Sequence, residues 1–177
     1  MLVYLLLHNI RSLHNVGSIF RTADGMGVKK IYLTGYTPSP YDFFGPPAGG
    51  LRKNFQKTAL GAEKYVEWER AKNIHALLKK LKKEKIFVTA LEQSKQSILL
   101  NSSLSNRIAK LLGNRRQSRP KLGIALILGN EVRGLPKSVL RISDAVFEIP
   151  MRGKKESLNV SVAAGIALYA IRFTLSC

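Results

Sequence analysis

Residues 2–33, LVYLLLHNIRSLHNVGSIFRTADGMGVKKIYL, contain the pattern that decides the fold. Residues 2–7 are almost continuously apolar, which is typical of a parallel strand buried on both faces. A helix is predicted next, with Asn15 as its N-cap. Its buried face is expected to consist of Val16, Ile19, Phe20, Ala23 and Met26. Residues 31–33 form the next predicted strand, so the stretch predicts a βαβ unit.

The same alternation continues through the rest of the chain. Residues 37–50 contain four prolines and three glycines, which predicts an irregular loop. A second amphipathic helix is predicted from Trp68, Ala71, Ile74, Leu78 and Leu81. The remaining predicted elements are strands at residues 86–91, 123–128 and 145–149 and a helix at 158–174. We therefore expect one α/β domain over residues 1–177, with a mainly parallel sheet and helices on both faces.

Composition limits the classes of function. A chain of 177 residues with 45% hydrophobic residues fits one globular domain. Its formal net charge of +18, from 29 Lys and Arg against 11 Asp and Glu, favours a polyanionic partner. No apolar run approaches the roughly 20 residues of a membrane span, and residues 1–7 lack the basic start of a signal peptide. We expect a cytoplasmic protein that binds nucleic acid and does not bind a membrane.

Metal and disulfide chemistry have little support in the sequence. Cys177 is the single cysteine, which excludes an intramolecular disulfide and a cysteine-based zinc site. The three histidines, His8, His14 and His75, are not spaced as metal ligands. We therefore expect no metal.

Residues 94–121 fit the alternation poorly. The segment has no acidic residue, and we interpret it as a basic insertion in the domain, in large part a mobile loop. Its cations in the second half are Arg107, Lys110, Arg115, Arg116, Arg119 and Lys121.

Three polar clusters follow predicted strands, and ligands of open α/β sheets bind where the carboxyl ends of strands converge. The clusters are residues 15–21, residues 129–135 and residues 149–159. Each has an ordinary explanation alone: Arg21 as a surface arginine, the second cluster as a turn, and the third as a helix N-cap. All three together indicate a ligand site.

In this order the clusters resemble the three motifs of the SPOUT superfamily of RNA methyltransferases, specifically its TrmH-like ribose 2'-O-methyltransferases. The resemblance covers nearly the whole chain. It rests on Asn15, Gly17 and Arg21, then Gly129, Asn130, Glu131, Gly134 and Leu135, then Ile149, Pro150, Met151, Ser157, Leu158 and Asn159.

The resemblance implies a C-terminal deep trefoil knot, a rare exception to unknotted topology. It also implies S-adenosylmethionine as cofactor, S-adenosylhomocysteine as product, and a homodimer with the terminal helix in its interface and the active site completed across it. By position, the cofactor contacts are Leu91 or its neighbour Ala90, then Gly129, Ile149, Met151, Ser157 and Leu158.

The implied reaction moves a methyl group from a sulfonium to a ribose hydroxyl, which needs positioning and no metal. The family's catalytic arginine maps to Arg21. Because a guanidinium is essentially never deprotonated in proteins, we expect Arg21 to clamp a phosphate and to stabilise alkoxide charge, while a base role assisted by RNA phosphate stays open. Asn15 with Ser157 or Asn159 would orient Arg21 and the substrate, and Glu131 would order the second loop or lie beside the arginine.

RNA is the expected polyanion, with transfer RNA favoured over ribosomal RNA. Tyr41, Phe43 and Phe44 are candidates either for stacking on a base or for packing over the sheet. Besides Arg21 and the lysines of residues 79–85, the expected RNA contacts are Arg52, Lys53, Arg115, Arg116, Arg152, Lys154 and Lys155.

Two alternatives remain open. One is an RNA-binding protein that keeps this fold without the reaction, against which the intact set of Asn15, Arg21, Glu131 and Ser157 argues. The other is an enzyme of the same superfamily that methylates a base nitrogen. A dinucleotide-binding protein is disfavoured, because no Gly-x-Gly-x-x-Gly turn follows the first strand.

Overall fold

The computed structural model describes residues 1–42, 50–95, 97–100 and 123–174. Among these residues, seven strands form one sheet in the order β3-β2-β1-β6-β4-β7-β5, and all paired neighbours are parallel. The strands are β1 (Leu2–His8), β2 (Lys30–Thr34), β3 (Glu67–Ala71), β4 (Ile86–Leu91), β5 (Ile98–Leu99), β6 (Gly123–Leu128) and β7 (Ala145–Glu148). This confirms the predicted α/β class with a parallel sheet.

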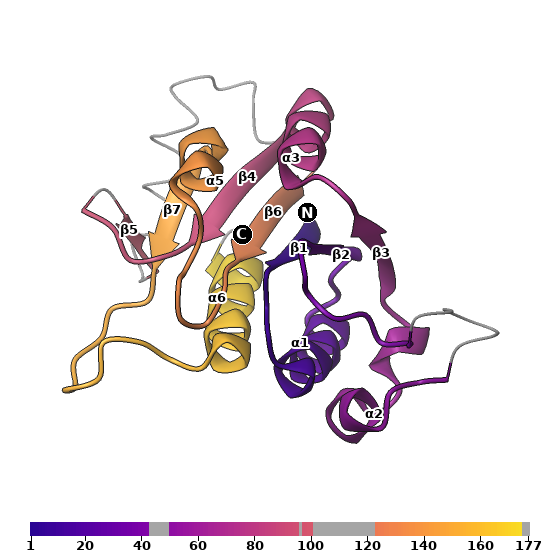
Figure 1. Cartoon of the computed structure of the whole chain (residues 1–177). Coiled ribbons are helices and arrows are strands. Elements are labelled where there is room, and N and C mark those ends of the chain that lie inside the picture. Colours follow the sequence, from indigo (N-terminus) through magenta and orange to yellow (C-terminus); the bar gives the residue numbers. More distant parts are fainter. Residues whose placement is uncertain (43–49, 96, 101–122, 175–177) are drawn as a thin grey trace.

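Helices cover both faces of the sheet (Figure 1). One face carries α1 (Leu13–Gly25) and α6 (Val160–Thr174), with the short α2 (Lys53–Ala59) against α1; the other face carries α3 (Ile74–Lys83) and α5 (Lys137–Ile142). A 3-10 turn, η1 (Ala62–Lys64), leads from α2 to β3. In the described part of the chain, no helix is both long enough and apolar enough to cross a membrane.

The central strand β1 shows why the core forms two layers. Leu5 and Leu7 pack with α1 and α6, whereas Leu6 between them packs with α3. Side chains alternate between the faces of a strand, and both faces are covered, so nearly every position in β1 and β6 must be apolar. This is the continuous pattern that predicted these strands.

The prediction of a helix through Trp68 and Ala71 is wrong. Residues 67–71 form β3 at one edge of the sheet, and α3 begins only at Ile74, where the Asn73 side chain accepts a hydrogen bond from Ala76 N (3.1 Å). As an edge strand, β3 has no fully buried residue and includes three charged ones, Glu67, Glu69 and Arg70. Its two apolar residues, Trp68 and Ala71, are three positions apart, which is a helical spacing.

Two helix starts also differ from the prediction. Ser12 is the N-cap of α1, with its hydroxyl accepting from Asn15 N (3.3 Å), so Asn15 lies inside the first turn. The last helix starts at Val160, and Asn159 Oδ1 accepts from Ser161 N (2.8 Å). The side chain of Asn15 is thus released from capping and is available to the site.

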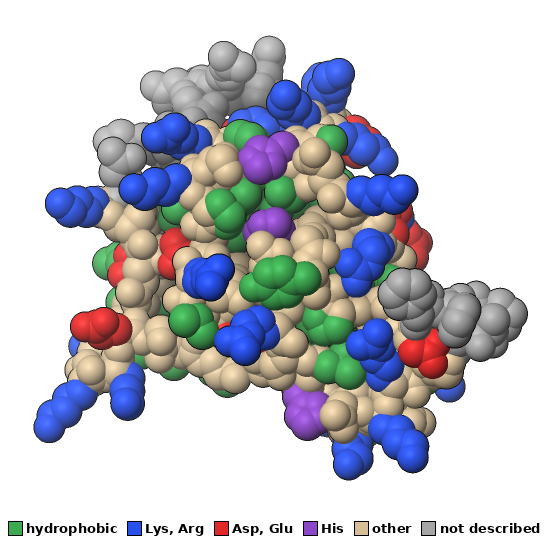
Figure 2. Space-filling view, viewed as in Figure 1, with side chains coloured by type: hydrophobic (Ala, Val, Ile, Leu, Met, Phe, Trp, Pro, Cys, Tyr) green, Lys and Arg blue, Asp and Glu red, His purple; other side chains and the backbone are tan. Residues whose placement is uncertain are grey.

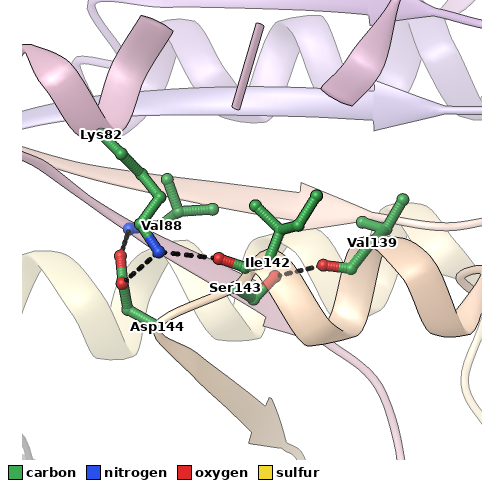
Figure 3. A network of polar contacts seen from close by, with 6 residues as sticks. All are labelled: Lys82, Val88, Val139, Ile142, Ser143 and Asp144. Atoms are coloured by element: carbon green, nitrogen blue, oxygen red, sulfur yellow. Dashed lines mark hydrogen bonds and ion pairs between the residues drawn. The ribbon is translucent and has the colours of Figure 1, made fainter. Parts of the chain in front are cut away.

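A polar network ties α3 to the start of β7 (Figure 3). Lys82 Nζ binds Asp144 Oδ1 (2.7 Å) and donates to Ile142 O (2.9 Å). Asp144 Oδ2 in turn accepts from Val88 N (2.9 Å). These contacts hold β7 beside β4 at the amino end of the strands. They therefore fix where the opposite, carboxyl end of β7 lies.

Candidate functional site

A pocket of about 250 Å³ opens at the carboxyl ends of β4, β6 and β7. Three segments that are far apart in the sequence meet there, as expected for the crevice of an open parallel sheet. The lining residues are Leu91, Glu92, Gln93, Leu128, Gly129, Asn130, Glu131, Val132, Gly134, Glu148, Ile149, Met151, Ser157, Leu158, Val160 and Ala163.

Most of the residues predicted to contact a cofactor lie in this pocket. They are Leu91, Gly129, Ile149, Met151, Ser157 and Leu158. Ala90 is instead fully buried on the α3 face of the sheet. Adjacent residues of a strand point to opposite faces, so Leu91 is the member of that pair that reaches the pocket.

Hydrogen bonds join one residue from each of the three sequence clusters. Asn15 Nδ2 donates to Glu131 Oε1 (3.0 Å), and Asn159 Nδ2 donates to Asn15 Oδ1 (3.1 Å). Glu131 also accepts from Arg11 N (3.1 Å) and Ser12 N (3.3 Å). The carboxylate therefore ties the second loop to the first turn of α1 beside the pocket.

The surroundings of Glu131 favour its ionised form. Partial burial raises the pKa of its carboxyl, but the hydrogen bonds from Arg11 N, the Asn15 amide and Ser12 N outweigh burial, and the net pKa is lowered. At neutral pH the group is an anion that can accept hydrogen bonds but has no proton to donate.

The glycines of the second cluster allow close packing of the pocket wall. Gly134 has a φ of +65°, and a Cβ there would lie 2.3 Å from Glu92 Oε2. A Cβ on Gly129 would lie 2.9 Å from the backbone of Gly134 and of Leu135. Because Gly134 has no side chain, the Glu92 carboxylate can lie close to it and accept a hydrogen bond from Leu135 N (2.8 Å).

Arg21 does not join this cluster. It is exposed on α1, and no hydrogen bond or ion pair links its side chain to another residue in the part of the chain that the structure describes. Asn15 and Asn159 bind each other and do not bind Arg21. Arg21 lies on α1, the helix that packs against α6; its neighbour Thr22 faces α6, because its methyl carbon would lie 3.7 Å from a Cβ placed on Gly165.

The predicted RNA contacts after β7 form a basic projection. Arg152, Lys154 and Lys155 are exposed on the loop that leads to α6 and extends from the body of the domain (Figure 1). Lys and Arg side chains are also spread over the face in Figure 2, where Asp and Glu are few. Arg115 and Arg116, like residues 101–121 of the proposed insertion, lie outside the described residues.

The residues near α2 have structural contacts. Lys53 is exposed, while Arg52 is partly buried and its Nε donates to Tyr41 O (3.1 Å). The ring of Tyr41 stacks on Trp68 at 6.2 Å and 19°, which agrees with the packing alternative for this tyrosine. Phe43 and Phe44 lie outside the described residues.

Sequence reasoning missed three charged or polar members of the pocket wall: Glu92, Gln93 and Glu148. Glu92 and Gln93 directly follow β4, and Glu148 is the last residue of β7, so the rule that ligands bind at strand ends could have identified them. Gln93 Nε2 donates to Glu156 O, and Ser97 Oγ donates to Glu148 Oε2.

The pocket wall has an unusual charge. Glu92, Glu131 and Glu148 contribute three carboxylates, and no Lys or Arg is among the described residues that line it, although the chain as a whole carries 29 of them against 11 acids. Among the residues described, no group of His, Cys, Asp and Glu is arranged to hold a metal ion.

Comparison with known proteins agrees with this architecture. The 23S rRNA (guanosine-2'-O-)-methyltransferase RlmB of Neisseria meningitidis is 30% identical over 168 residues, covering 95% of this chain and 57% of the relative. An AdoMet-bound rRNA methyltransferase from Sinorhizobium meliloti superposes with a TM-score of 0.77 at 26% identity, covering 98% of this chain and 57% of that one. The chain thus spans little more than half the length of these relatives.

A third structure has a similar length. It is described as giving insights into the 2-OH methylation of C/U34 on tRNA, and it superposes with a TM-score of 0.71 at 25% identity, covering 99% of this chain and 97% of that one. The family model for the SpoU rRNA Methylase family matches residues 2–169. This chain belongs to the SpoU rRNA Methylase family.

Proposed function

We propose that this protein transfers a methyl group from S-adenosylmethionine to a ribose 2'-hydroxyl of RNA. The observation that carries the proposal is an acidic pocket in a strongly basic chain, joined directly to the hydrogen-bonded cluster of Asn15, Glu131 and Asn159. A wall with carboxylates and no basic side chain favours a cationic ligand. S-adenosylmethionine fits, because its sulfonium and ammonium groups together outweigh its one carboxylate and leave the molecule with a net positive charge.

The pocket residues fit this cofactor in shape as well as in charge. Leu91, Leu128, Ile149 and Leu158 supply apolar walls, and the loops that follow three parallel strands bring backbone donors and acceptors to the same crevice. When bound, the cofactor supplies an electrophilic methyl group. The protein then has to position the hydroxyl in line with that methyl group and exclude water.

Arg21 is the residue that we assign to the substrate. In this proposal its guanidinium binds the phosphate next to the target ribose in a bidentate manner and stabilises the negative charge that develops on the attacking hydroxyl oxygen. As the O–CH3 bond would form and the S–CH3 bond would break to leave S-adenosylhomocysteine, the hydroxyl proton would pass to an oxygen of that phosphate and from there to solvent. Because the Arg21 side chain has no partner in the described structure, its guanidinium donors are available. Asn15 and Asn159 keep the adjoining wall ordered and act as positioning residues.

We further propose a homodimer that completes the active site. The outer side of α6 exposes a row of apolar side chains at helical spacing, namely Val162, Ile166, Tyr169 and Phe173. Such a row on a terminal helix favours burial against a second copy. Arg21 is exposed on α1, which packs against α6, and in this proposal a partner bound along α6 also covers Arg21 and removes it from bulk solvent.

The segment after β7 is proposed to be knotted. It passes the loops after β4 and β6 to reach α6, and Gln93 Nε2 holds it by donating to Glu156 O. Stretching single molecules from both ends tests this directly, because a knot shortens the fully extended chain whereas an unknotted chain reaches its full contour length.

Transfer RNA is the proposed substrate. Support comes from the superposition of 99% of this chain on the tRNA-related structure and from the basic projection of Arg152, Lys154 and Lys155. Contacts of this kind bind phosphate without reading sequence, so RNA affinity should fall steeply with added salt.

Replacing Arg21 tests the assignment. Arg21→Ala is expected to lower single-turnover methyl transfer about 100-fold or more while S-adenosylmethionine affinity, measured by calorimetry, stays unchanged. Arg141→Ala, at an exposed site on α5 across the sheet, is the control and should turn over normally. Near-normal methylation by Arg21→Ala would contradict the assignment.

A further inference from the structure

Tyr36 is an exposed aromatic residue that is held in place at both ends. It follows β2 and is 57% exposed. Its backbone N donates to Asn9 Oδ1 (3.2 Å), and its hydroxyl accepts from Asn130 Nδ2 (2.8 Å). Exposed tyrosines usually keep rotamer freedom and lose conformational entropy when a ligand orders them. The Tyr36 ring is already ordered in the free protein, so binding a ligand costs it little further entropy.

The hydrogen bonds place the ring across the carboxyl end of β1. In the sheet, β1 lies between β2, which precedes Tyr36, and β6, which precedes Asn130. The ring therefore reaches from the end of one neighbour to the end of the other, above Asn9. Asn9 itself has a φ of +60°, a conformation that few residues other than glycine adopt, and this lets its side chain meet Tyr36 N.

Asn130 connects this ring to the methylation site. Asn130 is only 7% exposed, and its amide is fully used: it donates to Asn9 O (3.0 Å) and Tyr36 Oη and accepts from Val132 N (3.0 Å) and Arg133 N (2.8 Å). It lines the pocket beside Glu131. The Tyr36 hydroxyl is thus hydrogen-bonded directly to a residue of the pocket wall.

Cationic residues lie on the segments around Tyr36. Arg70 donates from Nη1 to Gly35 O (3.0 Å) and from Nη2 to Thr37 O (2.5 Å), which places its guanidinium against both backbone neighbours of Tyr36. Arg133 and Arg11 are exposed on the two adjoining loops. An exposed aromatic face with cations on the neighbouring segments suits an unpaired base and its phosphates.

We propose that Tyr36 is the platform on which an unpaired RNA base stacks beside the methylated nucleotide. The inference rests on the proposed function, because it places the RNA across the strand ends next to the pocket. The hydroxyl fixes the ring through Asn130, and the ring face binds the base. The platform tolerates any base, since every base offers a π face.

Photo-cross-linking tests contact in the unmodified protein. A short single-stranded RNA carrying one 5-iodouridine is irradiated with the wild-type chain, and the adduct is mapped by mass spectrometry. We expect the principal adduct at Tyr36. Adducts that map elsewhere, with none at Tyr36, would overturn the proposal.

Affinity measurements separate the ring from its hydroxyl. Tyr36→Ala should weaken binding of the same RNA about tenfold, while Tyr36→Phe should bind within about twofold of the wild type, because stacking needs the ring. S-adenosylmethionine affinity should be unchanged in both. Tyr65→Ala, at another exposed tyrosine next to η1, is the matched control and should bind RNA normally.

Other outcomes are equally informative. Equal losses of RNA affinity in Tyr36→Ala and Tyr36→Phe would assign the effect to the hydroxyl and contradict stacking. Loss of S-adenosylmethionine affinity in Tyr36→Ala would make Tyr36 a support of the pocket. If the wild type bound no S-adenosylmethionine but still gave the Tyr36 adduct, the proposed reaction would fail while the RNA contact would hold.

Discussion

At the residue scale, Asn15 is the only side chain that bonds to both other sequence clusters in the described structure, donating to Glu131 and accepting from Asn159. An amide can do both at once, and a carboxylate cannot donate. The requirement at this position is therefore the amide itself, which explains why an asparagine placed within a helix is useful here despite its modest helix propensity.

Asn15→Asp should be harmful although it changes the shape very little. The new carboxylate would face that of Glu131 where a hydrogen bond of 3.0 Å now exists, and we expect a loss of about 1 kcal/mol in the free energy of unfolding at neutral pH. Urea denaturation measures this loss. Asn73→Asp is the control: Asn73 Oδ1 only accepts, from Ala76 N at an N-cap, where Asp serves equally well.

The pH dependence of that variant has a definite sign. In the wild type the pKa of Glu131 is lower in the folded than in the unfolded protein. Glu131 therefore adds to the free energy of unfolding at pH values above its unfolded pKa of about 4.3, and this stabilisation is lost as pH falls through its folded pKa. Facing carboxylates would share a proton in Asn15→Asp and raise a pKa, so the deficit should shrink as pH falls towards about 4. A deficit that is constant with pH would contradict the proposed repulsion.

At the scale of elements, Gly17 sets the distance between α1 and α2. A Cβ at Gly17 would lie 2.1 Å from Thr58 Oγ1 and 2.8 Å from Phe55 O. The side chain of Thr58 can rotate, but the carbonyl can move only with α2. The two helices also pack through Phe20 and Phe55, whose ring centroids are 5.2 Å apart in an edge-to-face arrangement.

Gly17→Ala is therefore expected to lower the free energy of unfolding by about 1–3 kcal/mol, as overpacking does. Gly25→Ala in the same helix is the control, because a Cβ there has no neighbour within 4 Å and alanine favours a helix. Thermal unfolding of both variants checks the contrast. Equal stability of the two would show that α2 moves away freely.

The accuracy of the predicted elements follows from their burial. The strands β4 and β6 have the predicted limits because they are buried on both faces and consist of continuous apolar runs. The edge strand β3 is predicted wrongly as part of a helix, because its residues are at most partly buried. The seven-residue α2 is missed, because only Phe55 and Ala59 are buried in it. Short or edge elements depend on contacts with distant residues that a local pattern does not contain.

The candidate site was predictable in its residues but not in its contacts. Asn15, Glu131 and Asn159 belong to recognisable clusters at strand ends, and the structure joins them by hydrogen bonds. The ordering of Tyr36 by Asn130 joins residues 94 positions apart, and no local spacing indicates such a pair. The separation of Arg21 from Asn15 within one chain was likewise not predicted.

At the scale of the whole molecule, the proposed dimer depends on the outer row of α6. Ile166→Glu would place a charge in that interface, and we expect sedimentation to give the mass of one chain for this variant and of two chains for the wild type. Its methyl transfer should also fall, since Arg21 would remain open to solvent. Tyr65→Glu, at an exposed tyrosine next to η1 and outside the apolar row of α6, is the control and should stay dimeric. A single-chain wild type that remains fully active would contradict the completion of the site by a partner.

The central claim is that the protein methylates RNA at the ribose. The most direct measurement incubates it with S-adenosylmethionine labelled in the methyl group and total RNA from cells that lack the protein, then identifies the labelled nucleoside by mass spectrometry after complete digestion. We predict label on a 2'-O-methylnucleoside, protecting the following phosphodiester from alkali. Label on a base, or no transfer while S-adenosylmethionine binds, would contradict the claim.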